Sequence, residues 1–439
     1  MLASRHRRSA AASRLAAVAL AAVGATLALL AAEPGTASAQ TVGQLARADD
    51  MATLRKIDVP AAWSLSKGAG VTVAVLDTGV LPTTPDLTGQ VTSGPDYTKG
   101  ANPAGYQPPH EHGTYIGSII AGHGSGPGRA DGVIGVAPDA KLLSVRVILD
   151  DQEPGFFVFN ENASYDDTIA SGIRYAVAHG AQVINMSLGS TEATRSVRQA
   201  LAAAIARNVV VVAAAGNDGT RGHAFTTYSY PASFTGVISV AAVGANGLRA
   251  SFSDRNSSVV VSAPGVNVVG DGPGGNFLSG DGTSPASAFV AGVAALIRSR
   301  YPALAPVQVM QAIVSSTRRH PPGGYSTGVG FGEVDAAAAL RAAGQLAQPG
   351  HAGGLAGSAR FGKTTRPIAV VHRDHPLIAR LTIAAGVAAA GFVVLMTALI
   401  VLLRRRRPNR LMPPAAPPPA APPPVAPPPA FPPGQPAGP

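Results

Sequence analysis

Blocks of apolar and polar positions alternate between residues 53 and 347, and this pattern predicts an α/β domain. Short, mostly apolar runs rich in β-branched residues are typical of parallel strands that are buried on both faces of a sheet. Alanine-rich stretches with helical spacing lie between these runs. Such alternation predicts a doubly wound, mostly parallel sheet with helices on both faces. The expected strands are 71–77, 142–148, 181–189, 209–217 and 237–243.

The first 39 residues have the pattern of a secretory signal peptide. Basic residues at 5–8 precede an apolar stretch at 15–32, and small residues at 37–39 allow cleavage before Gln40. Because the apolar stretch is long and rich in alanine, an uncleaved anchor helix is the alternative. Residues 40–60 would then form a short N-terminal extension, followed by the α/β domain at 61–348.

A second apolar segment predicts a transmembrane helix at 377–403. Residues 381–403 carry no charge, and at about 1.5 Å per residue they would cross a hydrocarbon core of about 30 Å. Four arginines follow at once, and the positive-inside rule keeps them in the cytoplasm. Residues 349–376 would be a Gly-rich linker, and 404–439 a cytoplasmic arginine cluster with a proline-rich tail. We therefore expect a single-pass protein of the cell membrane with its domain outside the cytoplasm.

The distribution of charge and the lack of cysteine exclude several classes of function. The chain has a formal net charge of +10, yet residues 51–350 hold 19 basic and 20 acidic residues. The excess lies at the two ends and reports on topology, so no nucleic-acid partner is indicated. Without cysteine there is no disulfide, thiolate metal site or cysteine nucleophile. The sequence has no evident metal-ligand cluster or phosphate loop, so we expect no cofactor.

Asp77 stands where an open α/β sheet places its functional groups. It ends an apolar strand and precedes a Thr-Gly turn. Simple capping of that turn explains a single aspartate equally well. The triplet Asp-Thr-Gly also occurs in aspartic proteases, but those enzymes use two carboxylates that share a proton. No second copy of the triplet is present, so we set that class aside.

His112 begins a helical stretch rich in small residues, HGTYIGSIIAG. An imidazole at the start of a helix that packs closely on the sheet could face the end of the Asp77 strand. His110 is the nearest alternative, but it lacks the adjoining glycine. Most of the ten histidines should lie on the surface, so His112 gains weight only in combination with other residues.

Ser284 begins a long helix after a glycine-rich turn, and Pro285 suits the first turn of that helix. The free N–H groups and dipole of a helix N-terminus stabilise negative charge that develops on a reacting group. A serine that only caps the helix is the alternative, although the flanking glycines favour a nucleophile. Asn217 ends another apolar strand, where its amide could donate to an oxyanion; Asn-Asp-Gly is also ordinary turn sequence.

Four segments together resemble the subtilisin-like serine proteases of peptidase family S8. VAVLDTGV, HGTYIGSIIAG, AAAGNDG and DGTSPASAFVAGVAAL match the Asp, His, oxyanion-Asn and Ser motifs, and the order Asp…His…Ser is that of subtilisin. The resemblance implies that Asp77 orients His112, which acts as general base and acid for the nucleophile Ser284. It also implies an oxyanion donor, Asn217. The substrate-binding residues that it implies are Ser187, Leu188, Gly189, Ala215 and Gly216.

The order of segments is similar to that of the mycosins, the proteases attached to type VII secretion systems. This similarity implies a membrane-anchored serine endopeptidase (EC 3.4.21) that processes protein substrates or components of a secretion complex. A structural subunit that stabilises such a complex, with little proteolysis, is the alternative. Structural calcium sites are common among subtilases, but the spacing of residues places none here.

The serine motif departs from the usual family pattern GTSMAxPHVAG. Pro285 directly follows the serine, while Ala288 and Phe289 replace the usual proline and histidine. Because the usual proline helps set the bend of the helix under the nucleophile, we expect a slow and selective enzyme. In the histidine motif, Tyr115 replaces a second histidine and should lie off the catalytic face.

The stretch 149–167 is longer and more acidic than the usual connection in this family. We expect it on the rim of the substrate cleft, near the strand that contains NMSLG. Four of its acidic residues would then favour basic or polar substrate segments, although a solvated loop is an equally good interpretation. These residues are Asp150, Asp151, Glu153 and Glu161.

Overall fold

The structure, a computed structural model, describes residues 41–219, 226–348 and 396. The chain divides into two compact units, 1–358 and 359–439. The predicted signal peptide, the predicted transmembrane segment apart from Met396, and the tail lie outside the described residues. The described residues contain no helix that is both long enough and apolar enough to cross a membrane.

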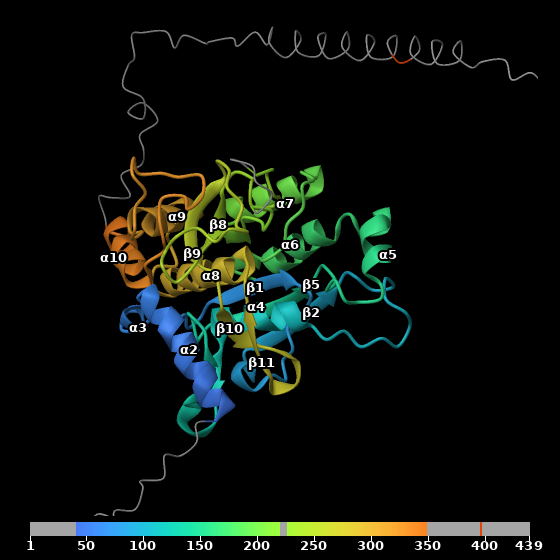
Figure 1. Cartoon of the computed structure of the whole chain (residues 1–439), viewed down its shortest axis with the longest axis horizontal. Helices are drawn as coiled ribbons and strands as arrows, with labels where there is room; N and C mark the ends of the chain where they lie inside the picture. The colour runs from blue at the N-terminus through green and yellow to red at the C-terminus, as the bar shows by residue number, and fades with distance from the viewer. Residues whose placement is uncertain (1–40, 220–225, 349–395, 397–439) are drawn as a thin grey trace, which may run out of the picture. The chain divides into compact units, whose positions relative to one another are not determined.

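A parallel sheet of seven strands forms the centre of the first unit (Figure 1). Its order is β2-β5-β1-β6-β7-β8-β9, so β1 lies at the point where the direction of winding reverses. Ligands bind at the carboxyl ends of strands next to such a point, and Asp77 is the last residue of β1. The strands are β1 (Thr72–Asp77), β2 (Val91–Asp96), β5 (Lys141–Arg146), β6 (Val183–Met186), β7 (Val210–Ala214), β8 (Val237–Val243) and β9 (Val259–Pro264).

Helices cover both faces of the sheet, as the sequence predicts. Successive side chains of a strand point to opposite faces, so Val73 and Val75 of β1 enter one core while Ala74 and Leu76 enter the other. The first core includes α4 (Glu111–Ala121) and α8 (Thr283–Arg300), and the second includes α6 (Thr168–Ala178) and α7 (Arg195–Ala206). The predicted α/β architecture is therefore confirmed.

The remaining elements surround this sheet. Two small antiparallel sheets pair β3 (His123–Ser125) with β4 (Asp131–Ile134) and β10 (Val268–Asp271) with β11 (Phe277–Gly280). The other helices are α2 (Val42–Lys56), α3 (Val59–Ala62), α5 (Phe156–Glu161), α9 (Pro306–Ser315) and α10 (Ala336–Leu346), with 3-10 turns η1 (Pro85–Leu87), η2 (Pro127–Arg129), η3 (Ala163–Tyr165) and η4 (Pro273–Gly275).

Helix α2, which lies in the predicted N-terminal extension, is joined to the domain by Arg47. A capping box between Thr41 and Gln44 begins the helix. The guanidinium of Arg47 donates to the carbonyl oxygens of Gly132 at 2.8 Å, Asp131 at 2.8 Å and Arg129 at 3.1 Å. One side chain thus satisfies three backbone acceptors of the loop around β4 and fixes α2 against it.

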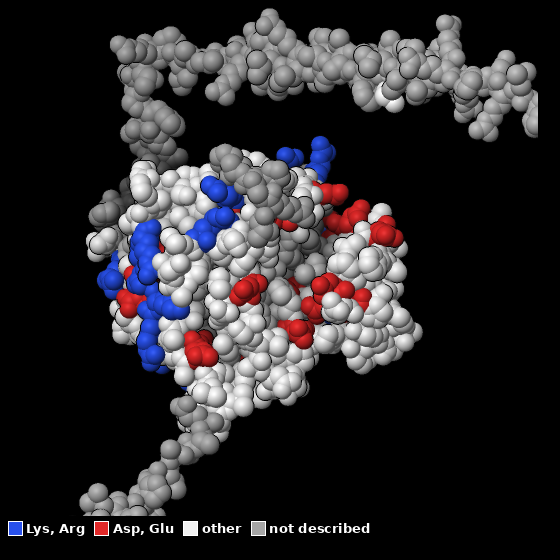
Figure 2. Space-filling model, in the orientation of Figure 1, with Lys and Arg blue, Asp and Glu red and all other residues white. Residues whose placement is uncertain are grey.

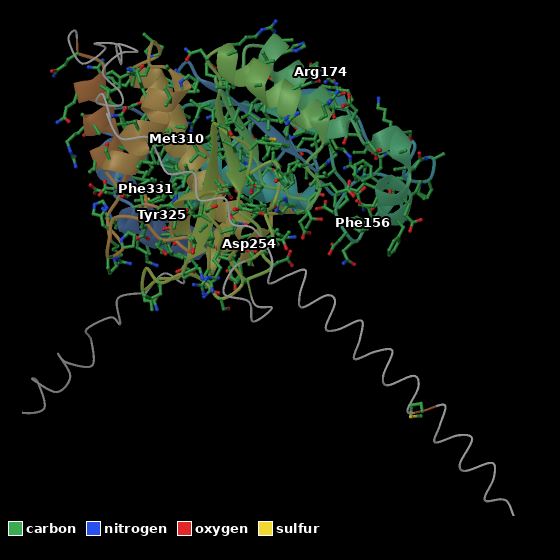
Figure 3. All side chains as sticks on the ribbon, turned by 90° about the horizontal axis from the view of Figure 1, so that it is seen from above. Phe156, Arg174, Asp254, Met310, Tyr325 and Phe331 are labelled. Carbon is green, nitrogen blue, oxygen red and sulfur yellow. The ribbon has the colours of Figure 1, made fainter. Side chains whose placement is uncertain are left out.

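Charged side chains are unevenly distributed over the face shown in Figure 2. Lysine and arginine gather on the side of α10, whereas aspartate and glutamate lie over the middle and the opposite side. Figure 3 places Phe156, on α5, at the outer edge of the domain, well away from Tyr325 and Phe331. The acidic side of this face is therefore the one that carries the α5 region.

Candidate active site

Asp77 and His112 form a hydrogen-bonded pair at the carboxyl end of β1. Nδ1 of His112 lies 2.7 Å from Oδ1 of Asp77. The aspartate side chain is fully buried, whereas the histidine side chain is 33% exposed. Oδ1 of Asp77 also accepts from the N–H of Thr78 at 2.8 Å. A buried carboxylate that holds one nitrogen of an accessible imidazole leaves the other nitrogen free to exchange protons.

The turn after Asp77 and the start of α4 are fastened together, and this fixes His112. The N–H of Gly113 donates to the Thr78 hydroxyl at 3.0 Å, and Nδ1 of His110 lies 2.6 Å from the Thr78 carbonyl oxygen. A Cβ at Gly113 would come within 2.0 Å of the Gly79 carbonyl oxygen. Glycine is therefore required here, because the helix start touches the turn. His110, which the sequence offered as the alternative to His112, instead helps to hold the turn against the start of α4.

A buried ion pair that sequence reasoning missed stands behind the same turn. The guanidinium of Arg146 donates to the Thr78 carbonyl oxygen at 2.9 Å and to Oε2 of Glu153 at 2.7 Å. Both side chains are almost completely buried. The prediction that Glu153 lies on the cleft rim is wrong. Its buried carboxylate pairs with Arg146 and accepts a hydrogen bond from the side-chain amide of Asn102 at 2.6 Å. Only the packed structure brings residues 102, 146 and 153 together.

Asp150 brings a second carboxylate to the catalytic region. Its Oδ2 is buried without a hydrogen-bond partner, and its N–H donates to Oε1 of Glu153 at 3.0 Å. Burial lowers the pKa of His112, but the carboxylates of Asp77, Asp150 and Glu111 outweigh that effect and raise it above 6.5 overall. Burial and the nearby Asp77 raise the pKa of Asp150 itself.

Ser284 reaches the same strand end through Ser187. In the parallel pair β1–β6, Val75 aligns with Asn185, so Asp77 and Ser187 follow at equivalent positions on neighbouring strands. The hydroxyl of Ser284, in the first turn of α8, donates to the Ser187 carbonyl oxygen at 3.2 Å. The described residues contain no hydrogen bond between Ser284 and His112. Gly282 is the N-cap of α8, so Ser284 does not serve as the helix cap.

The hydroxyl groups of Ser187 and Ser287 fix the backbone at Ser284. This is the segment in which the serine motif departs from the family pattern. The Ser187 hydroxyl donates to the Ser284 carbonyl oxygen at 3.1 Å and lies 2.9 Å from that of Ser287. Ser287 in turn donates to the Ser284 carbonyl oxygen at 2.8 Å. Ala288 and Phe289 are buried in the core. Hydrogen bonds and close packing therefore hold the helix start without the usual proline.

Asn217 is anchored through its oxygen, which leaves its amide nitrogen for donation. Oδ1 accepts from the N–H and from the hydroxyl of Thr283, both at 2.9 Å. The side chain is thereby oriented toward the loop that carries Ser284. Tyr115 of α4, expected off the catalytic face, donates to the Val268 carbonyl oxygen at 2.9 Å and packs against β10 and β11.

A cavity of about 260 Å³ opens beside Ser284. Four of the five predicted substrate-binding residues line it: Ser187, Leu188, Gly189 and Gly216. Ala215, the fifth, does not line the cavity: its side chain packs with Ala241 and Val259, and Ala214 lines the cavity instead. Strand alternation explains the difference. The sequence did not single out Asp218 and Asp254, which also line the cavity.

A second cavity, of about 530 Å³, continues along the same edge. It is lined by Leu188, Gly189 and Ser190 on one side and by residues of 148–169 on the other, among them Phe156 and Tyr165. The expectation that 149–167 lies beside the NMSLG segment is confirmed. The two cavities share residues 188–190, so an extended peptide laid along this segment would reach both.

Three buried carboxyl groups, on α2, η1 and β10, lie away from this cleft. Asp50 accepts from the N–H of Ile134 and Asp86 from that of Val133. Burial raises the pKa of Asp50 to about 8 and that of Asp271 to about 9, with Arg47 as a nearby cation that lowers both. Across residues 41–219 and 226–348, no group of three or more histidine or acidic side chains is arranged to hold a metal ion.

Comparison with known proteins identifies the class that this fold and site define. Residues 68–332 match the Subtilase family, peptidase family S8, and the chain belongs to this family of serine proteases. It is 39% identical to subtilisin DY of Bacillus licheniformis over 277 residues, which cover 62% of this chain and 92% of that protein. It is 38% identical to thermitase of Thermoactinomyces vulgaris over 246 residues, or 56% of this chain and 81% of that one.

Mycosins are among the solved structures that this chain resembles. MycP1 from Mycobacterium smegmatis is 31% identical with a TM-score of 0.54, and the match covers 66% of this chain and 83% of that one. MycP3 protease from the type VII (ESX-3) secretion system is 33% identical with a TM-score of 0.53, covering 66% and 87%. The resemblance stated from the motifs is therefore confirmed at the level of family and of structural neighbours.

Proposed function

We propose that this chain is a membrane-anchored, extracytoplasmic serine endopeptidase that processes substrates or components of a type VII secretion system. The observation that carries the enzymatic part is the 2.7 Å contact between His112 and buried Asp77, next to a serine in the first turn of a helix. The likeness to MycP1 and MycP3 supports the secretion context. The apolar segment 381–403, followed by four arginines, supports the anchor.

In this mechanism Asp77 keeps the Nδ1 proton of His112 in place, so Nε2 is free to accept the proton of Ser284. The Ser284 hydroxyl now donates to Ser187, and it turns toward His112 when a substrate enters. Oγ then attacks the peptide carbonyl carbon. His112 returns the proton to the leaving amine as the C–N bond breaks, and water hydrolyses the acyl-enzyme by the same steps.

Two hydrogen-bond donors stabilise the oxygen that becomes negatively charged in the tetrahedral intermediate. One is the amide nitrogen of Asn217, whose oxygen is already fixed by Thr283. The other is the start of α8, where backbone N–H groups lack partners within the helix. Donors that are oriented before the reaction stabilise the intermediate without reorganisation, which is the main source of rate enhancement in such sites.

A second candidate is a structural subunit of the secretion complex with little proteolysis. The observation that favours it is the orientation of Ser284, whose hydroxyl is bonded to Ser187 and not to His112. Replacement of the native gene by Ser284→Ala separates the two. Loss of substrate cleavage together with loss of secretion supports the enzyme, whereas normal secretion with cleavage abolished supports the structural subunit.

The proposed anchor is tested in the same strain. The full-length protein should stay in the membrane fraction after alkaline carbonate extraction, and a chain ending at residue 376 should leave it. In intact cells, external protease should reach the α/β domain but not a tag placed after residue 439. Release of the full-length protein by carbonate, or protection of the domain, would contradict this topology.

A further inference from the structure

The cavity beside Ser284 contains a carboxylate that the catalytic mechanism does not use. We propose that Asp254 selects lysine or arginine as the substrate residue immediately before the scissile bond. This inference rests on endopeptidase chemistry at Ser284 and assigns the class of side chain that the adjacent cavity accepts.

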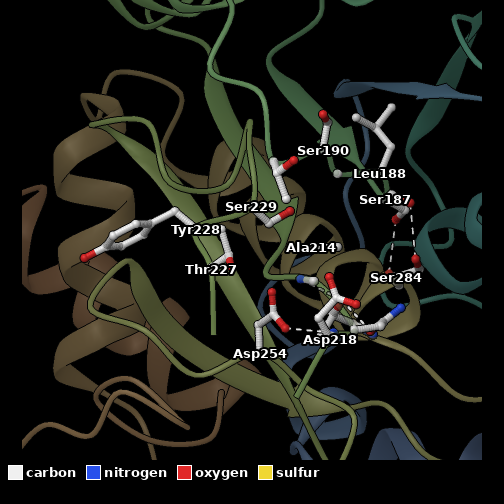
Figure 4. A pocket seen from close by; sticks show the side chains of 15 residues that line it. Ser187, Leu188, Ser190, Ala214, Asp218, Thr227, Tyr228, Ser229, Asp254 and Ser284 are labelled. Atoms are coloured by element: carbon white, nitrogen blue, oxygen red, sulfur yellow. Dashed lines mark hydrogen bonds between the residues drawn. The ribbon is translucent and has the colours of Figure 1, made fainter. Parts of the chain in front are cut away.

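The shape and lining of the cavity suit a long side chain with a polar tip. Figure 4 places Ser187 and Ser284 on one side of it, with Asp254 and Thr227 across from them. Leu188, Gly189 and Ala214 supply apolar wall, and Ser229 and Thr227 supply hydroxyls. Lysine and arginine combine an apolar stem with a charged head, so they match such a lining better than a purely aliphatic side chain.

Asp254 is held rigidly at the wall of this cavity. Its Oδ1 accepts from the N–H of Asp218 at 2.8 Å, and its own N–H donates to the Gly216 carbonyl oxygen at 2.9 Å. Gly216 has φ +112°, and a Cβ there would lie 2.2 Å from Oδ2 of Asp254. The absence of a side chain at residue 216 therefore leaves room for this carboxylate beside the cavity.

No lysine or arginine of the described residues lines the cavity that contains Asp254. The charged residues that line it are Asp218 and Asp254. Arg249 is close enough to lower the pKa of Asp254, but its guanidinium donates to the carbonyl oxygens of residues 250, 251 and 253. Arg255, the next residue in sequence, does not line the cavity.

Desolvation makes a cationic partner favourable at this position. Asp254 is only 2% exposed, and burial, with a smaller contribution from Asp218, raises its pKa to about 6. At neutral pH the carboxylate is therefore ionised but poorly solvated. Such a charge is stabilised by a partner of opposite sign, and a bound lysine or arginine head would supply it.

The test compares peptides that differ only in the residue before the scissile bond, lysine or its uncharged analogue norleucine. With the full-length wild-type protein at pH 8, we expect kcat/KM for lysine to exceed that for norleucine by about tenfold or more, the size of a hydrogen bond to a charged group. Asp254→Asn should abolish this preference, because a neutral amide does not favour a cationic head over norleucine. Asp151→Asn, which removes an exposed acid outside the cavity, should leave the preference unchanged.

The wild-type protein alone provides a second test. Because Asp254 must be ionised to hold a cation, the lysine-to-norleucine ratio should rise as pH increases through about 6, and it should be flat in Asp254→Asn. Equal or faster cleavage of norleucine by the wild type, or a lysine preference that survives in Asp254→Asn, would overturn the proposal. Absence of cleavage of every peptide, with no reaction of Ser284 toward a fluorophosphonate, would instead refute the endopeptidase chemistry.

Discussion

Oδ1 of Asp77 holds Nδ1 of His112 at 2.7 Å, while Oδ2 of the same carboxylate is buried without a hydrogen-bond partner. The carboxylate is thus committed to the imidazole and to the N–H of Thr78. Asp77→Asn should keep the shape of the site but favour the wrong histidine tautomer. We expect kcat to fall by about 10⁴-fold. Steady-state cleavage of a peptide substrate measures this, and a loss below tenfold would mean that Asp77 does not orient His112.

The pH dependence of kcat/KM should carry the signature of two further carboxylates near His112. Asp77, Asp150 and Glu111 together outweigh desolvation and raise the pKa of His112 above 6.5. The imidazole must be neutral to act as a base, so activity should rise with pH through a midpoint above 6.5.

Asp150→Asn removes one of these charges and should move that midpoint to lower pH. Asp151→Asn is the matched control, because Asp151 is adjacent in sequence but exposed. The full pH–rate profile of each variant is the measurement. Equal midpoints in Asp150→Asn and wild type would show that Asp150 has no influence on the imidazole.

The side chain of Asn217 has two separable roles. Its oxygen is anchored by Thr283, and its amide nitrogen is the proposed donor to the oxyanion. Asn217→Ala removes both and should lower kcat by about 10²–10³-fold. Asn217→Asp keeps an acceptor for Thr283 but removes the donor, so it should be similarly slow while keeping the stability of the wild type. If Asn217→Asp retained full kcat, the proposed oxyanion contact would be wrong.

Arg47 should stabilise the domain more than Arg55, the other arginine of α2, does. Arg47→Ala leaves three backbone carbonyls without their donor, and we expect a loss of about 2 kcal/mol in the free energy of unfolding. Arg55→Ala on the exposed side of the same helix is the control and should change it by less than about 0.5 kcal/mol. Urea unfolding of both variants measures these free energies. Equal losses in the two variants would contradict the role assigned to Arg47.

Buried Asp271, at the end of β10, predicts a loss of folding stability as the pH rises toward 9. The pKa of Asp271 is about 9 in the folded protein against 3.8 in the unfolded chain, so the folded state binds its proton more tightly. The resulting stabilisation is complete below about pH 4 and is lost as pH rises through 9. Asp271→Asn needs no proton, so its Tm relative to wild type should increase from pH 5 to pH 9. A difference that does not vary with pH would exclude a buried protonated Asp271.

Local patterns were sufficient to predict most of the sheet and to single out Asp77, His112 and Ser284. Apolar runs revealed the five central strands because burial on both faces removes polar residues from them. The two outer strands, β2 and β9, were missed. In β2 the segment VTSGPD contains glycine, proline and polar residues, which hide the strand pattern. Each of these three residues stands at an element end inside a recognisable motif, and their catalytic roles stay a prediction.

Contacts between distant segments could not be predicted in this way. Glu153 was taken for a rim residue, because nothing near it in sequence shows that Arg146 pairs with it in the interior. Asp254 lies 30 residues from Ser284, the nearest cavity residue that the motifs single out, and only packing places it at the cavity wall. Alternation within β7 and the segment after it, not residue type, decides that Ala214 and not Ala215 lines the cavity beside Ser284.

Covalent reaction of Ser284 tests the central claim most directly. The full-length protein should be labelled by a fluorophosphonate probe at pH 8, with peptide mapping placing the adduct on Ser284. Ser284→Ala should show no labelling, and His112→Ala should show strongly reduced labelling, because the hydroxyl then lacks its base. A wild-type protein that remains unlabelled, or a Ser284→Ala protein that is labelled as strongly as wild type, would contradict the assignment of Ser284 as the nucleophile of a serine endopeptidase.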